Sequence, residues 1–115
     1  MASARYQFFT RFPRVVEWRL ISSNNRELGR CTEPYSDLVS CTAAVERLRD
    51  RIDSADELVL QDPSGGWRWR LSFQDQAVAM SCRAYTRRVE CTATLLQFRR
   101  IAGEALAVPQ LRIFR

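Results

Sequence analysis

The sequence contains no histidine and no lysine, and the missing histidine narrows the chemistry that the protein can perform. Without an imidazole there is no histidine base, nucleophile partner or metal ligand. The four cysteines form no Cys-x-x-Cys pair of the kind that holds zinc or exchanges disulfides. Gly65-Gly66 precedes a predicted strand, whereas a phosphate-binding glycine loop precedes a helix. We therefore expect no enzymatic activity, no metal and no cofactor.

Long apolar runs are also missing. No stretch approaches the roughly 20 apolar residues that cross a bilayer, and the N-terminus through Phe12 lacks the apolar segment of a secretory signal. We therefore expect a soluble cytoplasmic protein with no membrane partner. A chain of 115 residues buries roughly two-thirds of its unfolded surface on folding, which is enough for one core. We predict a single domain over residues 1–115.

The basic residues are all arginine. They number 18 against 13 acids, which gives a net charge of +5, and the excess is shared between the two halves of the chain. A modest surplus of this kind supports solubility and weak attraction to anions. It does not by itself indicate nucleic-acid binding.

The most informative feature of the chain is an internal duplication. Four segments of the first half recur in the second: Trp18-Arg19-Leu20 as Trp69-Arg70-Leu71, Cys31 as Cys82, Tyr35-Ser36 as Tyr85-Thr86, and Cys41-Thr42-Ala43 as Cys91-Thr92-Ala93. The period is 51 residues up to the first cysteine and 50 thereafter, which places a one-residue deletion at Glu33-Pro34, opposite Ala84. Self-similarity at a fixed period indicates a repeat architecture. We assign repeat one to residues 5–56 and repeat two to residues 57–115.

Hydrophobic periodicity predicts the same order of elements in both copies. Alternating or apolar runs predict strands, and apolar residues three and four apart predict a helix. The predicted strands are 6–11, 16–22, 27–32, 57–61, 67–73, 77–83 and 111–114. One helix starts after a Ser36 cap and buries Leu38, Cys41, Val45, Leu48 and Ile52. The other starts after a Thr86 cap, spans 89–102 and buries Cys91, Leu95, Phe98 and Ala102.

This pattern predicts an α+β fold of two tandem β-β-β-α repeats related by a pseudo-two-fold axis. Each helix has one apolar face, and the central strands are apolar on one side and arginine-bearing on the other. One antiparallel-rich sheet with both helices on the same face buries all of these apolar surfaces in a shared core and leaves the arginines exposed. The last strand closes the sheet.

The repeated motifs resemble those of the YegP-like bacterial proteins. The matching residues in the second copy are Trp67 to Leu71, the Asp75-Gln76 turn, Ser81, Tyr85-Thr86 and Cys91. Those in the first copy are Glu17 to Leu20, the Asn24-Asn25 turn, Tyr35-Ser36 and Cys41. The chain departs from the family at both turns, where Asn-Gly is usual, and in lacking lysine.

The resemblance implies a fold but no activity. Family members join two β-β-β-α-β units into one sheet and exchange their terminal strands. Applied to this chain, residues 57–61 would pair with the other half and residues 111–115 would cross back to the first. A strand-exchanged homodimer is then an alternative to a monomer.

The cysteines leave two interpretations open. Cys31, Cys41, Cys82 and Cys91 are either buried reduced thiols or form one disulfide within each repeat. The missing secretory signal favours the thiols, because cytosolic cysteines are kept reduced.

The candidate binding residues are arginines on two surfaces. Arg19, Arg68 and Arg70 are predicted on the outer sheet face, where Arg112 and Phe114 join them from the last strand. These arginines, with an aromatic residue beside them, would bind phosphates and stack a base. The alternative is a solvated sheet face that binds nothing.

On the second helix, Arg88 and Arg99 are eleven residues apart and share one face. That patch would dock an acidic partner or a nucleic-acid backbone, or it is the solvent side of the helix. The paired aromatics Trp18/Trp69 and Tyr35/Tyr85 would form two symmetric ligand pockets, or they pack the core.

The function that these observations favour is that of a small non-enzymatic interaction or accessory protein with a protein partner. The alternative is a nucleic-acid or ribosome-associated protein that uses its arginine-rich sheet or helix face.

Overall fold

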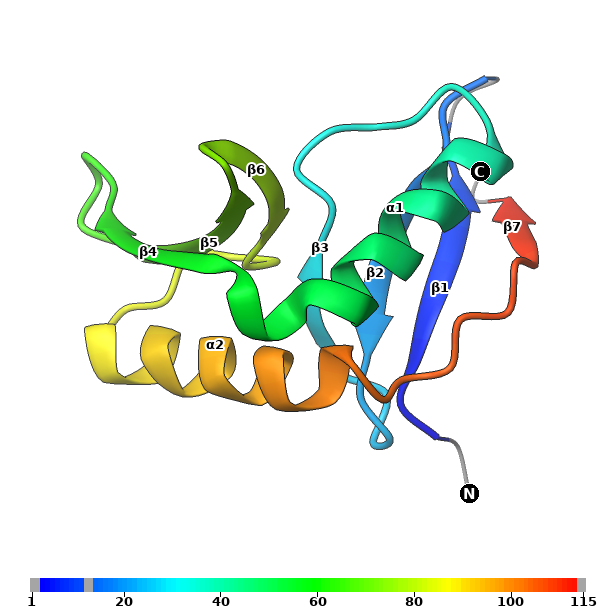
Figure 1. Cartoon of the computed structure of the whole chain (residues 1–115). Coiled ribbons are helices and arrows are strands. Elements are labelled where there is room, and N and C mark those ends of the chain that lie inside the picture. Colours follow the sequence, from blue (N-terminus) through cyan, green and yellow to red (C-terminus); the bar gives the residue numbers. More distant parts are fainter. Residues whose placement is uncertain (1–2, 12–13, 114–115) are drawn as a thin grey trace.

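The computed structural model describes residues 3–11 and 14–113 and contains one mixed sheet with two α-helices (Figure 1). The sheet has seven strands in the order β4-β5-β6-β3-β2-β1-β7, and every pair except β1–β7 is antiparallel. This confirms the α+β class and the antiparallel-rich sheet. The strands are β1 (Arg5–Thr10), β2 (Glu17–Ile21), β3 (Glu27–Arg30), β4 (Asp56–Gln61), β5 (Trp67–Phe73), β6 (Gln76–Met80) and β7 (Leu111–Ile113). The helices are α1 (Leu38–Arg51), the short 3-10 helix η1 (Ile52–Ser54) and α2 (Arg88–Ala102).

The last strand returns to the first half of the chain. β7 pairs in parallel with β1 over Phe8–Thr10, and Figure 1 shows the red strand beside the blue one. The predicted crossing is therefore confirmed for residues 111–113, while 114–115 lie outside the described residues. The prediction that residues 57–61 pair with the other half of the chain is wrong, since our assignment begins repeat two at residue 57. β4 pairs along its whole length with β5 of its own repeat, because a short turn at 62–66 folds the two strands into a hairpin.

A three-stranded ladder, β4-β5-β6, and a four-stranded ladder, β3-β2-β1-β7, meet at one narrow joint. β3 and β6 pair through the single position Arg30–Met80, whereas β4–β5 pair through six positions and β1–β2 through five. A single bridge contributes little to holding two ladders together. The side chains beneath the sheet must supply the rest of the connection.

Backbone pairing corrects the alignment of the two copies. Cys31 donates its N–H to the Trp18 carbonyl, and its Sγ accepts from the Trp18 N–H at 3.5 Å. Ser81 makes the same two contacts with Trp69, its Oγ accepting at 3.4 Å. Ser81 is thus the counterpart of Cys31, and the predicted match between Cys31 and Cys82 is wrong.

The one-residue slip lies in the hairpin turns and not at Glu33-Pro34. In the first hairpin Asn25 alone has a positive φ, of 65°, and the chain closes through Ser22 and Arg26. In the second, Gln74 and Asp75 both have positive φ, of 50° and 66°, as in a two-residue primed turn. The tighter turn uses one residue fewer, which shortens the period from 51 to 50 before the cysteine.

Both helices pack against the same face of the sheet. One cluster of buried side chains includes Trp18 and Leu20 from β2, Trp69 and Leu71 from β5, and residues of both helices. The predicted buried stripe of α2 is confirmed in full: Cys91, Leu95, Phe98 and Ala102. In α1, Cys41, Val45 and Leu48 are buried, Ile52 is buried in η1, and Leu38 is half-buried.

The predicted helix caps are one residue early. Asp37 caps α1 by accepting the Ser40 N–H at 2.7 Å, so Ser36 does not. Arg87 occupies the N-cap position of α2 and makes no side-chain cap bond, so Thr86 is not the cap. Asp outranks Ser only slightly as a cap, so sequence alone separates the two poorly.

Gly29 allows α2 to approach the joint between the ladders. The Phe98 ring stacks near Trp18 at 6.4 Å between ring centroids and near Trp69 at 4.9 Å. A Cβ at position 29 would lie 2.7 Å from Trp69 Cη2 and 2.8 Å from Phe98. Position 29 therefore requires glycine, because the Trp69 and Phe98 rings fill the space that a side chain would occupy.

We expect Gly29→Ala to lower the free energy of unfolding by about 1–3 kcal/mol, because overpacking displaces buried rings. Gly103→Ala is the matched control: its Cβ would lie 3.4 Å from Ile52, and the backbone there is helical. Urea denaturation followed by tryptophan fluorescence measures both. Equal stability of the two variants would show that the rings do not require glycine at position 29.

Candidate functional site

The outer sheet face carries a row of arginines that crosses the joint between the ladders. Paired residues in adjacent strands point to the same face of a sheet. The strand register places six residues in one row, namely Leu58, Arg70, Met80, Arg30, Arg19 and Gln7. A second row places Glu17, Phe9 and Arg112 side by side on β2, β1 and β7. Two of the predicted residues from different repeats, Arg19 and Arg70, thus share a row.

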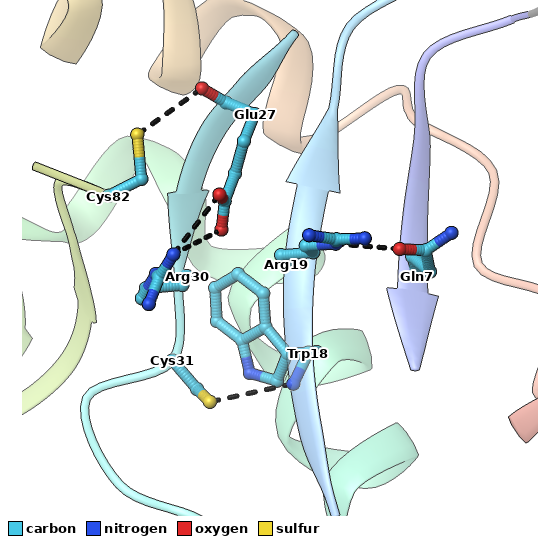
Figure 2. A network of polar contacts seen from close by, with 7 residues as sticks. All are labelled: Gln7, Trp18, Arg19, Glu27, Arg30, Cys31 and Cys82. Atoms are coloured by element: carbon cyan, nitrogen blue, oxygen red, sulfur yellow. Dashed lines mark hydrogen bonds and ion pairs between the residues drawn. The ribbon is translucent and has the colours of Figure 1, made fainter. Parts of the chain in front are cut away.

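Arg19 is held over a buried ring. Its Nε donates to Gln7 Oε1 at 2.6 Å, as Figure 2 shows, and its guanidinium lies 5.3 Å from the Phe9 ring centroid. Arg11 approaches the same ring at 5.3 Å, which leaves Phe9 only 2% exposed. Burial lowers the pKa of Arg19, Glu27 opposes this, and the charges of Arg30, Arg11 and Arg112 lower the pKa further. Several guanidinium groups therefore gather around Phe9.

Arg30 was missed by sequence reasoning although it lies at the centre of the row. It forms an ion pair with Glu27 at 2.9 Å (Figure 2), and its Nε is buried without a hydrogen-bond partner. Across the joint, the Cys82 thiol donates to the Glu27 carbonyl at 3.4 Å. The available signal was its place between Gly29 and the buried Cys31, because neighbouring residues of a strand face opposite sides of the sheet.

The three other predicted sheet arginines are exposed. Arg68 lies 3.6 Å from Asp62 in a loose ion pair. Arg70 and Arg112 are exposed, and neither has an ion pair or hydrogen bond to another described residue. Phe114, predicted beside Arg112, lies outside the described residues. Arg70 and Arg112 are thus free to contact a partner.

The two predicted helix arginines have different environments. Arg88 is exposed and lies 5.4 Å from the Trp67 ring centroid. Arg99 is mostly buried and binds inside the fold: its two Nη groups donate to the carbonyls of Ile52, Asp53 and Ala55 and to Glu57 Oε2. These bonds fasten α2 to η1 and β4. Arg88 and Arg99 therefore do not form one exposed patch.

The four thiols are free, and three of them are buried. Burial raises the pKa of Cys31 to about 11 and that of Cys41 to about 12, so both are protonated near neutral pH. Thiols in this state behave as small hydrophobic residues. Among residues 3–11 and 14–113, no group of three or more Cys, Asp or Glu side chains is arranged to hold a metal ion. In the same residues, neither α-helix is long and apolar enough to span a bilayer.

The paired aromatics differ between the two copies. Trp69 Nε1 donates to Thr94 Oγ1 at 3.2 Å, and burial raises the pKa of Tyr85 while the Thr94 hydroxyl opposes this rise. Trp18 Nε1 is buried and forms no hydrogen bond. Both tryptophans are 1% exposed and belong to the core. The two tryptophan environments are therefore not symmetric at the indole N–H.

Comparison with known proteins identifies the fold. No family model matches the sequence, and no curated protein matches it. Among solved structures, the YegP protein of Escherichia coli, described as of unknown function, matches all of this chain and 97% of its own, with a TM-score of 0.79 and 8% identity. A UPF0339 protein from Shewanella oneidensis matches 96% of this chain and 92% of its own, with a TM-score of 0.80 and 10% identity.

The class of protein is thus an α+β domain with the YegP fold. The sequence resemblance is confirmed at the level of fold. At 8–10% identity the likeness shows the fold and no activity, and the Escherichia coli protein is itself described as of unknown function.

We expect Arg99→Ala to destabilise the protein by about 1–3 kcal/mol, because three carbonyls lose a charged donor while the exposed Glu57 pair adds little. Arg100→Ala removes the same charge from an exposed neighbouring position. Thermal unfolding followed by circular dichroism compares the two. A melting temperature for Arg99→Ala equal to that of Arg100→Ala would contradict the structural role.

Stability should fall as the pH rises above about 9. A thiol in the unfolded chain ionises near 9.0, but Cys31 and Cys41 in the folded protein ionise only near 11 and 12. Between these values the unfolded state releases protons that the folded state keeps, so the folded state loses its advantage. Urea denaturation at pH 7 and pH 10 measures the change. Cys41→Ala should reduce the loss of unfolding free energy between pH 7 and pH 10. An unchanged loss would show that Cys41 is not its source.

Proposed function

We propose that the protein is a small non-enzymatic interaction module that binds an acidic protein surface through its outer sheet. The contact surface, here called the arginine face, consists of Arg19, Arg30, Arg70, Arg112 and the covered Phe9. The observation that carries the proposal is the row of guanidinium groups that crosses from one ladder to the other. Arginine suits carboxylate partners because its planar fork donates two parallel hydrogen bonds.

The geometry of the arginine face favours a protein partner over a nucleic acid. Single-strand binders stack bases on exposed aromatic rings. Phe9 is covered by Arg11 and Arg19, so its ring is not available to a base. Part of the positive charge is already neutralised, because Arg30 pairs with Glu27. Two exposed side chains without an ion pair to another described residue, Arg70 on β5 and Arg112 on the edge strand β7, suit separate carboxylates better than a continuous phosphate backbone.

The proposal that the module lacks enzymatic activity rests on the state of its reactive groups. Burial raises the pKa of Tyr6, Cys31, Cys41, Cys82 and Cys91, which keeps these side chains neutral. An activated nucleophile needs the opposite shift. The reduced thiols also support our proposal of a cytoplasmic location, where cysteines stay reduced.

We also propose that the two halves are tandem copies of one unit related by a pseudo-two-fold axis. In support, Val16 exchanges two backbone hydrogen bonds with Tyr35, and Trp67 exchanges the same two with Tyr85. Cys41 and Cys91 are both fully buried in the first turns of α1 and α2. Because β7 pairs with β1 of the same chain, the last strand has its partner without a second chain, which supports a monomer over a strand-exchanged homodimer.

Charge reversal on the arginine face should abolish partner binding. We expect Arg70→Glu/Arg112→Glu to lose a partner that the wild type and Arg26→Glu/Arg100→Glu both retain, since all four altered residues are exposed. Affinity capture from the source cells identifies the partner, and titration with the purified partner then measures its Kd. The affinity should weaken by at least about tenfold, the effect of losing charge-assisted contacts.

Two results would overturn the proposal. Equal binding by the two charge-reversed variants would show that the arginine face is not the contact surface. Gel-shift binding of RNA or DNA that strengthens as salt is lowered, and that only the face variant loses, would favour the nucleic-acid alternative.

A further inference from the structure

A cavity of about 370 Å³ lies on the helix side of the molecule, away from the arginine face. Its walls come from α1, from the segment before that helix, and from the β5–β6 hairpin of the other repeat. This volume is within the range of small-molecule sites. The cavity therefore spans the two copies and has room for a small organic ligand.

A buried donor without an acceptor lies at the wall of this cavity. Trp18 is 1% exposed, and its indole Nε1 is buried without a hydrogen bond. Burial raises the pKa of the Tyr35 hydroxyl, and the nearby Trp18 N–H opposes this rise, but the pair does not reach ordinary hydrogen-bond geometry. Leaving a buried N–H without an acceptor is unfavourable, so this N–H marks a position at which a ligand acceptor would be stabilising.

In the second half of the chain, the equivalent indole N–H has an acceptor within the protein. Trp69 Nε1 donates to Thr94 Oγ1, and Thr94 in turn donates to the Cys91 carbonyl. Counted from the matching cysteines Cys41 and Cys91, the residue at the Thr94 position in α1 is Ala44. Ala44 has no oxygen, and it forms part of the cavity wall. Repeat one thus lacks the acceptor that repeat two carries.

Two arginines accompany the missing acceptor. Arg47 and Arg51 also line the cavity, and with Ala44 they lie on one face of α1 at spacings of three and four residues. The same positions of α2 are the uncharged Gln97 and Ile101. The half of the chain whose indole N–H is unpaired therefore also contributes two arginines to the cavity that Trp18 lines.

The charge of the lining limits the charge of the ligand. Glu33 lines the cavity together with the two arginines, which leaves one net positive charge. Phe73, Ala77 and Val78 supply an apolar wall from the β5–β6 hairpin. A monoanion with an apolar body matches both features.

We propose that this cavity binds a small organic monocarboxylate. One carboxylate oxygen accepts from the Trp18 N–H in the space beside Ala44, and Arg47 and Arg51 neutralise the charge. The apolar body lies against Phe73 and Val78. Because the indole nitrogen is sealed in the empty protein, the half-buried Tyr35 turns outward to admit the oxygen.

Indole N–H signals test the proposal with benzoate as the probe. In ¹⁵N-labelled protein each of the three tryptophans gives a separate indole cross-peak. At constant ionic strength, benzoate should move the Trp18 peak saturably and leave the Trp69 peak in place, because Trp69 already has Thr94. Neutral benzamide has the same size and should move neither peak.

Two variants locate the site. Ala44→Thr places the hydroxyl of repeat two in repeat one, and it should abolish the benzoate-induced shift by supplying the acceptor internally. Arg47→Ala/Arg51→Ala should weaken benzoate binding by at least about tenfold, the effect of losing charged donors. Arg26→Ala/Arg100→Ala removes the same charge elsewhere on the surface and should bind benzoate as the wild type does.

Three results would overturn the assignment. The first is a Trp18 signal that benzoate does not move. The second is equal weakening by the two arginine double variants, which would show general attraction of anions. The third is a folded Ala44→Thr protein that binds benzoate with unchanged affinity. If Ala44→Thr does not fold, the arginine double variants still decide between the cavity and the rest of the surface.

Discussion

The packing of Phe98 between the two tryptophans holds the molecule together. The ladders share only the Arg30–Met80 bridge in the sheet, so backbone pairing alone joins them weakly. Phe98 of α2 lies beneath that bridge and contacts Trp18 of one ladder and Trp69 of the other. This contact is possible because Gly29 leaves the volume open. One aromatic residue on one helix thus makes a continuous core out of two half-sheets.

The same strand register that buries the tryptophans exposes the arginines. Residues alternate between the faces of a strand, so Trp18 and Trp69 inside require Arg19 and Arg70 outside. The bridge between β3 and β6 then brings Arg19, Arg30 and Arg70 into one row across both ladders. The arginine face is in this sense a consequence of the core, because the joint that α2 stabilises also sets the spacing of the guanidinium groups.

The segments that recur in the sequence differ where their side chains meet polar groups. Periodicity predicted the buried stripe of α2 in full and most of that of α1, where Leu38 is only half-buried. Position 44/94 is different: Thr94 bonds the indole of Trp69, while Ala44 leaves that of Trp18 without a partner. Sequence comparison shows an alanine opposite a threonine but cannot show that this threonine accepts the hydrogen bond of a buried indole N–H. Likewise the helix pattern places Arg99 on the protein surface. Only the tertiary structure shows that the segment following α1 brings three backbone carbonyls to its guanidinium.

By itself the sequence determined the fold class, the order of the strands and helices, and the buried faces of α1, α2, β2 and β5, because these depend on local periodicity and on segments that recur along the chain. Register and long-range partners were decided by the tertiary structure. The turn at Gln74-Asp75 is one residue shorter than its counterpart, and this aligns Ser81, not Cys82, with Cys31. A change of one residue in a turn is nearly silent in composition and spacing. It nevertheless sets which side chains face each other across the sheet, because pairing is fixed by backbone hydrogen bonds between segments far apart in the chain.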